Sequence, residues 1–281
     1  MDRSVYINGK FFPEAEAKIS VFDRGFLFAD GVYEVTTVLD EKLVDWDGHM
    51  ERLKQSLNKV SMTLPVKAEE LNTIHLDLIK RNNISEGLVY MQVSRGIADR
   101  DFIIPSSTVE SLVMFTQKLD LLDSARLNRG LRVITVPDIR WGRCDIKTVQ
   151  LMASSLIKTD AKNKGYDDAW LVKDGYITEG TSSNAFIISS EKKLITRCLG
   201  SEILAGVTRS AILEAATALG LIIEERPFSV EEAQLAAEAF ITSSTSFITS
   251  VVEINGRIIG NHEIESITKE LRRLYLKNIQ K

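Results

Sequence analysis

One lysine of the chain lies where an amine could carry out chemistry. Lys147 stands in RWGRCDIKTVQ (residues 140–150), between an irregular Arg/Trp/Gly/Cys segment and apolar residues at helical spacing. A primary amine held in a partly desolvated cleft has a lowered pKa and can attack a carbonyl to form a Schiff base. Most lysines are solvated surface residues, so a chemical role for Lys147 depends on the groups that accompany it.

A carboxylate lies in a stretch of small polar residues. ITEGTSSNAF (residues 177–186) places Glu179 before a glycine, three hydroxyl residues and Asn184. Taken alone, such a stretch is more often an ordinary polar loop. A carboxylate fixed there would instead favour a proton on a neighbouring ring nitrogen, because a nearby negative charge stabilises the cation. A protonated ring is the electron sink that pyridoxal phosphate (PLP) chemistry needs.

Two further stretches are suited to binding an anion. In ILAGVTRSAILEAATALG (residues 203–220), Gly206-Val207-Thr208 precede an apolar-periodic helix, and the free N–H groups of a helix N-terminus attract phosphate. The loop TSSTSF (residues 242–247) offers several hydroxyl donors, and Arg52 in GHMERL adds a cation. Taken alone, each stretch is more often a capped helix or a polar loop.

These groups must be positioned by an α+β chain of two domains. The chain has 281 residues, more than one core usually organises. The apolar pattern lapses around residues 122–130, so we predict one domain over 1–121 and another over 122–281. The first domain is expected to combine helices with an antiparallel sheet.

The local patterns predict most elements. We expect a hairpin with a type I′ turn at Asn8-Gly9, a helix with Asp47 as its N-cap, and a buried helix after Lys147. The other predicted ranges are strands at 32–39, 87–96, 111–117, 131–136, 169–172, 185–188, 221–224, 239–242 and 248–254, and helices at 68–81, 149–164, 208–219 and 264–279.

Composition narrows the classes of function. The net charge of −4 and the pI near 5.6 argue against a nucleic-acid binder. Two cysteines and three histidines provide neither a disulfide framework nor metal-ligand spacing. We find no signal peptide and no apolar run long enough to cross a membrane. These features predict a cytoplasmic protein without a metal site.

In this order, the stretches resemble the class-IV (fold-type IV) PLP-dependent aminotransferases. The resemblance is carried by Glu179, Asn184–Phe186, LIT at 194–196 and LAGVTR at 204–209, and DIRWGRCDIK and DRGFLFADGVYE extend it over nearly the whole chain. It implies a two-domain fold, with a smaller N-terminal α/β domain and a larger C-terminal, PLP-binding domain that contains a barrel-like sheet. It also implies a homodimer with the active site at the subunit interface.

The resemblance also implies roles for individual residues. Lys147 would hold PLP as a Schiff base and move the substrate proton, and Glu179 would pair with the pyridine nitrogen. The remaining cofactor residues would be the phosphate ligands Arg52, Val207, Thr208 and Ser244, with Leu204 supporting the ring. The substrate would contact Tyr33, Arg100 and Ser243.

Within the family, FADGVYEV and VSRGIADRDFIIP are most similar to the D-amino-acid enzymes. There an RxH pair clamps the substrate carboxylate, and here the matching residues are Arg100 and Phe102. Phenylalanine loses one polar contact, of order 1–3 kcal/mol if nothing replaces it, whereas Arg100 can still hold a carboxylate in a fork. We therefore expect transamination of a D-amino acid, of the D-alanine type, with a 2-oxo acid such as 2-oxoglutarate.

Other interpretations of the same sequence remain open. A branched-chain L-amino-acid or (R)-amine aminotransferase, or an aminodeoxychorismate lyase, would share this scaffold, and so would a non-catalytic PLP carrier. Arg100 could instead form a surface ion pair with Asp99 or Asp101. His49, on the same predicted helix as Arg52, is as compatible with packing as with lining the cofactor.

Overall fold

The computed structural model describes residues 3–122, 129–260 and 266–280. The chain forms two compact units, which we call the N-terminal and C-terminal units. The N-terminal unit comprises residues 1–120 together with 146–150, and the C-terminal unit comprises 121–145 together with 151–281. The short segment that carries Lys147 therefore belongs to the N-terminal unit.

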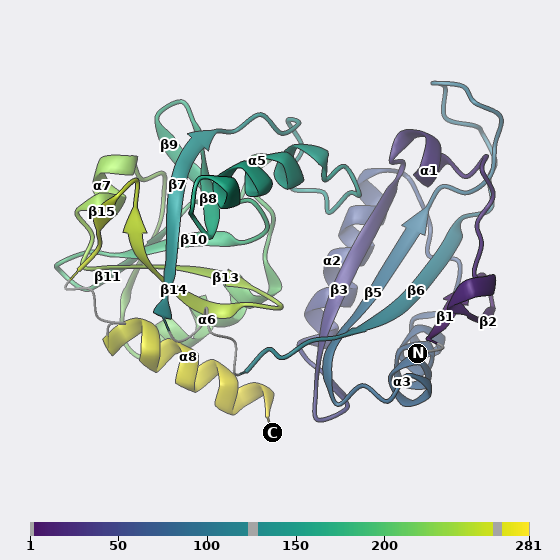
Figure 1. The fold of residues 1–281 in the computed structure, drawn as a ribbon, viewed down its shortest axis with the longest axis horizontal. Helices are drawn as coiled ribbons and strands as arrows, with labels where there is room; N and C mark the ends of the chain where they lie inside the picture. The colour runs from purple at the N-terminus through teal and green to yellow at the C-terminus, as the bar shows by residue number, and fades with distance from the viewer. Residues whose placement is uncertain (1–2, 123–128, 261–265, 281) are drawn as a thin grey trace. The chain divides into compact units, whose positions relative to one another are not determined.

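The N-terminal unit is built on a sheet whose six described strands are all antiparallel, in the order β2-β1-β6-β5-β3-β4 (Figure 1). The expectation of an antiparallel sheet is confirmed. Asn8 and Gly9 both have positive φ, as a type I′ hairpin turn requires. The strands are β1 (Ser4–Ile7), β2 (Lys10–Pro13), β3 (Gly31–Leu39), β4 (Lys42–Leu43), β5 (Glu86–Ser94) and β6 (Ser111–Lys118).

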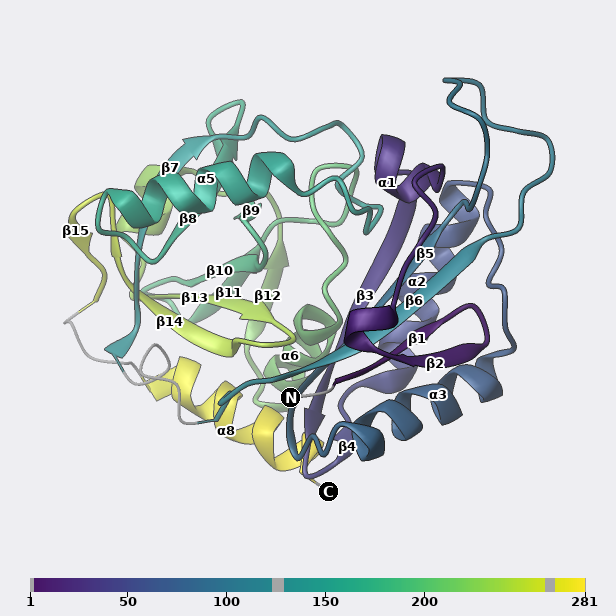
Figure 2. The same ribbon diagram turned by 45° about the vertical axis from the view of Figure 1, so that its right-hand side comes forward.

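Helices α2 (Trp46–Lys59) and α3 (Ala68–Arg81) cover one face of this sheet (Figure 2). Leu53 and Leu57 of α2 are buried in this core, and burying each side chain contributes roughly 1.5–3 kcal/mol. The range predicted for α3 is confirmed, but the predicted N-cap of α2 is wrong. The cap is Asp45, in the left-handed region with φ 52°, so Asp47 lies inside the first turn. A short helix α1 (Arg24–Phe28) and a 3₁₀ turn η1 (Glu14–Glu16) complete the unit.

The segment 146–150 is joined to the N-terminal unit by backbone hydrogen bonds. Tyr33 N donates to Lys147 O at 3.0 Å, and Val149 N donates to Gly31 O at 3.1 Å. Thr148 also forms an isolated antiparallel bridge with Val32. These bonds place Lys147 beside the start of β3.

The C-terminal unit holds a mixed sheet of nine described strands. Its order is β12-β11-β10-β13-β14-β7-β8-β9, with β15 paired to β14. Because β9 also contacts β10, the sheet curls back on itself, which confirms the expected barrel-like form. The strands are β7 (Leu131–Pro137), β8 (Asp168–Lys173), β9 (Tyr176–Gly180), β10 (Asn184–Ile188), β11 (Lys193–Thr196), β12 (Ile222–Glu225), β13 (Glu238–Ser243), β14 (Phe247–Ile254) and β15 (Arg257–Ile258).

Four described helices pack around this sheet: α5 (Met152–Asn163), α6 (Val207–Ala218), α7 (Val230–Gln234) and α8 (Ser266–Ile279). Helix α8 contacts α6 and β14 (Figure 1), and α5 contacts β7 and β8 (Figure 2). The prediction that the helix after Lys147 is buried is wrong, because Met152 is 73% exposed and Leu156 61% exposed. None of the described helices is both long enough and apolar enough to span a membrane.

Candidate active site

The structure brings two of the predicted site residues together in the N-terminal unit. The Lys147 backbone is fixed by Tyr33 N and by a 3.3 Å hydrogen bond from its own N–H to Ser56 Oγ. Lys147 is half-buried, and its Nζ lies 4.3 Å from the centroid of the Tyr33 ring. A cation at this distance from an aromatic face is attracted by the ring. The amine of Lys147 is therefore held against an aromatic wall rather than extended on a solvated face.

Arg52 is part of a buried cluster centred on Glu34, a residue that the sequence analysis did not single out. Arg52 Nε and Nη2 donate to the two Glu34 carboxylate oxygens at 2.8 and 2.7 Å, and His49 Nδ1 lies 2.8 Å from Glu34 Oε2. Burial alone would raise the pKa of Glu34, but the Arg52 charge and these hydrogen bonds lower it to about 2. Glu34 thus orients the Arg52 guanidinium, and His49 packs against the same carboxylate.

In the C-terminal unit, the carboxylate of Glu179 is buried at the end of β9. Arg140 Nη1 donates to its Oε1 at 2.6 Å. Asn184 Nδ2 and Leu204 N donate to its Oε2 at 3.0 and 3.1 Å. Burial raises the pKa of Glu179 to about 7, although Arg140 acts in the opposite direction. The ionised form therefore lacks full compensation and would interact strongly with another cation.

Arg140 is a site residue that sequence reasoning missed. Besides Glu179, its guanidinium binds both carboxylate oxygens of Asp138, at 2.9 and 2.8 Å. Asp138 in turn accepts from Thr178 Oγ1 at 2.9 Å. Arg140 lies in the quoted RWGR stretch, but nothing in the sequence distinguishes it from a surface arginine. The signal is only its position seven residues before Lys147, in the stretch that carried the resemblance.

The N-terminus of α6 offers hydrogen-bond donors without protein partners. Gly206 is the N-cap and makes no side-chain cap, and Thr208 lies in the first turn. In the part of the chain that the structure describes, the buried Oγ1 atoms of Thr208 and Thr242 have no hydrogen-bond partner. Thr242 pairs directly with Asn184 across β13 and β10. Buried hydroxyls are rarely left unpaired, and a helix N-terminus with such donors is suited to an anion.

The remaining predicted residues of this unit lie around the same cluster. Leu204 takes part in the cluster through its backbone. Its N–H donates to Glu179, and its carbonyl oxygen accepts from Asn184 Nδ2 at 2.9 Å. Ser243 ends β13, and its Oγ accepts from Ser246 N at 3.1 Å. Ser244 follows in the same loop, and Val207 opens α6.

Arg100 lies on a loop of the N-terminal unit between two aromatic rings. Its guanidinium carbon is 5.5 Å from the Phe28 ring centroid and 5.6 Å from that of Phe102. Among the described residues it forms no ion pair with Asp99 or Asp101, so the surface ion-pair interpretation is wrong. Phe102 itself is 80% exposed.

Comparison with known proteins identifies the family. Residues 31–254 match the family described as Amino-transferase class IV. The chain belongs to the class IV aminotransferases. It is 34% identical to the D-alanine aminotransferase of Staphylococcus haemolyticus over 98% of both chains.

Solved structures confirm the class IV fold. The branched-chain amino acid aminotransferase of Escherichia coli superimposes with a TM-score of 0.91 at 21% identity, covering 99% of this chain and 95% of that one. The branched-chain aminotransferase of Thermoproteus uzoniensis, solved with norvaline, gives a TM-score of 0.88 at 24% identity, covering 99% and 94%. At these identities the similarity concerns the fold alone.

Class IV aminotransferases are PLP-dependent, and the residues of this class IV aminotransferase fit that cofactor. The unpartnered hydroxyl of Thr208 at the α6 N-terminus suits a phosphate group. The incompletely compensated carboxyl of Glu179 suits a cationic ring nitrogen.

Proposed function

We propose that this aminotransferase transfers the amino group of a D-amino acid, of the D-alanine type, to a 2-oxo acid such as 2-oxoglutarate by a ping-pong mechanism. The observation that carries the proposal is the 34% identity to a D-alanine aminotransferase over 98% of both chains. The arginine kept at position 100 supports a substrate that bears a carboxylate.

Bound PLP supplies an aldehyde that condenses with amines and a ring that accepts electrons. We propose that Lys147 Nζ would hold this aldehyde and would move a proton between the substrate α-carbon and C4′ of the cofactor. The Tyr33 ring, whose centroid is 4.3 Å from Nζ, would hold the Lys147 amine in place during the reaction. Free rotation of the lysine into solvent would otherwise cost proton-transfer efficiency.

Glu179 is proposed to keep the ring nitrogen protonated. Its ionised form is disfavoured by burial, and a cation beside it would relieve that cost. Arg140, Asn184 and Leu204 N fix both oxygens, so the carboxylate needs no reorganisation when it binds. Glu179 and Lys147 are proposed to act on the same cofactor molecule.

The phosphate group is assigned to the donors that lack protein partners. The N–H groups of Val207 and Thr208 and the Thr208 hydroxyl would bind phosphate oxygens at the start of α6. Ser244 would add a hydroxyl, and Arg52, held in orientation by Glu34, would add a positive charge. Leu204, fixed through its backbone, would support the ring.

The substrate carboxylate is proposed to bind Arg100, with Tyr33 and Ser243 as further contacts. We propose that Arg100 acts in the active site of a neighbouring copy within a homodimer. The loop exposes an apolar surface that a second copy would cover, since Ile97 is 60%, Phe102 80% and Ile103 75% exposed. A cytoplasmic location is also proposed, supported by two cysteines that are both free thiols.

A substrate panel tests the proposed function. Purified enzyme with 2-oxoglutarate is expected to convert D-alanine to pyruvate and D-glutamate, and to turn over L-leucine or an (R)-amine at least ~100-fold more slowly. Lys147→Ala should abolish steady turnover, whereas Lys164→Ala, at the exposed C-cap of α5, should not. Preference for L-leucine or the amine would instead identify another aminotransferase. Pyruvate formed from aminodeoxychorismate without an acceptor would identify a lyase.

A further inference from the structure

Two buried arginines of the N-terminal unit share one carboxylate. Asp30 Oδ2 accepts from Arg24 Nε and from Arg95 Nε, each at 2.8 Å. Arg24 is 3% exposed and Arg95 4% exposed. Neither guanidinium can turn without losing its counter-charge, because removing one partner of a buried ion pair leaves a charge uncompensated. The three side chains therefore form a rigid group, which we call the Asp30 triad.

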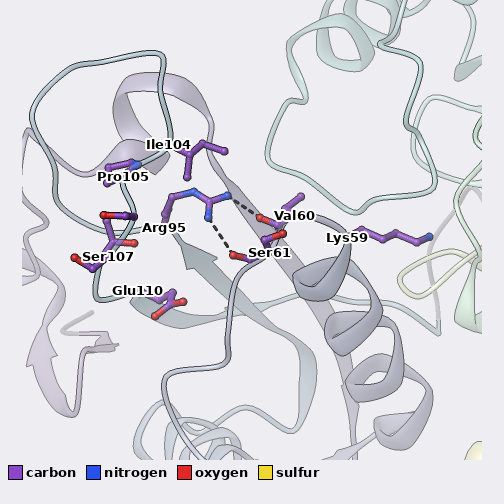
Figure 3. Close-up of a pocket in the computed structure, with 10 residues that line it drawn as sticks. Lys59, Val60, Ser61, Arg95, Ile104, Pro105, Ser107 and Glu110 are labelled. Atoms are coloured by element: carbon purple, nitrogen blue, oxygen red, sulfur yellow. Dashed lines mark hydrogen bonds between the residues drawn. The ribbon is translucent and has the colours of Figure 1, made fainter.

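One end of the triad is fixed to helix α2. Arg95 Nη2 donates to Val60 O at 2.9 Å and Nη1 donates to Ser61 O at 3.3 Å (Figure 3). These carbonyls lie at the C-terminal end of α2, where backbone acceptors lack partners within the helix. Since Leu53 and Leu57 anchor α2 in the core, the position of Arg95 is set by the core of the unit.

The other end of the triad reaches the loop that carries Arg100. Arg24 Nη1 donates to the carbonyl oxygen of Asp101 at 2.7 Å, next to Arg100 in the chain. The Arg24 guanidinium carbon also lies 4.5 Å from the Phe28 ring centroid, and Arg100 lies over the same ring at 5.5 Å. The Phe102 ring packs edge-on against the Phe28 ring, with the two ring centroids 5.6 Å apart. Arg100 is thus held by a ring and a backbone that Arg24 positions.

The rest of the loop is not packed against the triad. Residues 104–108 and Arg95 line a cavity of about 540 Å³. Ile104 and Pro105 lie on the other side of this cavity from Arg95 (Figure 3). The part of the loop before Arg100 is bound to residues 22–24 by backbone hydrogen bonds. Arg24 N donates to Gly96 O at 2.8 Å, and Ala98 N donates to Phe22 O at 3.2 Å. The contacts to residues 22–28 therefore fix the part of the loop that bears Arg100.

We propose that Asp30, with Arg24 and Arg95, is a positioning group that sets the orientation of Arg100 and through it the affinity for the substrate carboxylate. This inference rests on the proposed role of Arg100. The triad touches neither Lys147 nor Glu179, so its effect belongs to substrate binding and not to proton transfer. The Phe28 ring transmits it, because both guanidinium groups lie over that ring.

A double-mutant cycle tests the inference. Asp30→Asn, Arg100→Lys and the double variant are compared with the wild type, using D-alanine or another amino acid that the substrate panel shows to be accepted. Asp30→Asn should raise KM about tenfold with kcat nearly unchanged, and the double variant should be no worse than Arg100→Lys, because residues that act through one another are not additive. Glu14→Gln, which removes an exposed ion pair with Arg3, should change neither constant.

A second variant covers the case in which Asp30→Asn does not fold. Phe28→Leu keeps the triad but removes the ring between Arg24 and Arg100, and it should also raise KM non-additively with Arg100→Lys. Additive effects, or a lower kcat at unchanged KM, would overturn the inference while leaving the proposed function intact. If Arg100→Lys alone leaves KM unchanged, the carboxylate role of Arg100 and the inference both fail, although transamination stands.

Discussion

Two buried glutamates show how neighbouring charges set the state of a carboxyl group. Glu34 receives two hydrogen bonds from one guanidinium and a third contact from His49, and its pKa falls to about 2. Glu179 receives one bond from a guanidinium that Asp138 also binds, and its pKa rises to about 7. The first site is saturated with positive charge, whereas the second has room for one more cation. A ring nitrogen is the cation that the proposed function would place there.

Arg140 should therefore influence catalysis without touching the substrate. Arg140→Gln removes the positive charge that lowers the pKa of Glu179, so that pKa should rise above 7. We expect kcat to fall about 10- to 100-fold, as for the loss of one hydrogen bond to a charged group. The acid limb of the kcat profile should also move to higher pH. Arg143→Gln, which breaks an exposed pair with Asp145 in the same loop, is the matched control. Profiles that coincide with the wild type would rule out this role.

At the scale of elements, the start of α6 depends on the absence of a side chain at Gly206. A Cβ at this position would lie 2.0 Å from Asn184 Oδ1, so the asparagine would have to move. Asn184 Nδ2 holds both Glu179 and the Leu204 carbonyl. The glycine is thus required by close approach and not by backbone conformation.

Gly206→Ala should therefore weaken both cofactor binding and stability. We expect PLP affinity to fall about tenfold or more, and the free energy of unfolding to fall by about 1–3 kcal/mol, because Asn184 loses hydrogen bonds in a buried site. Titration of the apoenzyme with PLP and urea unfolding measure the two effects. Gly200→Ala is the control, because a Cβ there meets no atom within 4 Å. Equal affinity in the two variants would show that Asn184 can adjust without loss.

Elements that depend on local signals could be predicted from the sequence, and elements that depend on distant partners could not. The Asn8-Gly9 turn and helix α3 follow from turn chemistry and periodicity. The sequence pattern predicts a polar loop where the structure has strand β9 (Tyr176–Gly180), because the end of the strand is followed directly by the hydroxyl residues 181–183. Its pairing with β8, which no local pattern shows, defines the strand.

The residues of the candidate site also fall into those that a local motif indicates and those that depend on distant partners. Lys147, Tyr33 and Glu179 were found through their motifs. No local pattern could show that residues 146–149 pair with the start of β3, more than 100 residues earlier in the chain. Glu34 and Arg140 were missed, because their significance depends on partners that only the fold brings close.

At the scale of the whole molecule, buried groups in the two units have pKa values that are shifted in opposite directions. In the N-terminal unit, the pKa of Glu34 is lowered to about 2, and burial lowers that of His75 to about 4. Both groups bind protons more readily when unfolded. The stability that they contribute is present at neutral pH, and it is lost as pH falls from 6.5 to 4 for His75 and from 4.5 to 2 for Glu34.

The pKa of Glu179, in the C-terminal unit, is shifted in the opposite direction. Its folded pKa of about 7 lies above the usual 4.5, so the stability it contributes to the apoenzyme is present below pH 4.5 and is lost as pH rises to 7. The side chain at position 179 of the Glu179→Gln variant cannot ionise. The free energy of unfolding of this variant, relative to that of the wild type, should therefore increase by up to about 3 kcal/mol between pH 4.5 and 7. Urea unfolding of both apoproteins between pH 4.5 and 7 measures the difference.

The control and the cofactor separate this effect from a general change in stability. Glu191→Gln, at an exposed position of the same unit, should differ from the wild type by a constant amount across the interval. Saturating PLP should reduce the pH-dependent gain of Glu179→Gln, because a ring cation beside an ionised Glu179 removes the reason for its raised pKa. A gain that is independent of pH in the apoprotein would contradict the raised pKa. A gain that PLP leaves unchanged would mean that Glu179 does not face the ring nitrogen.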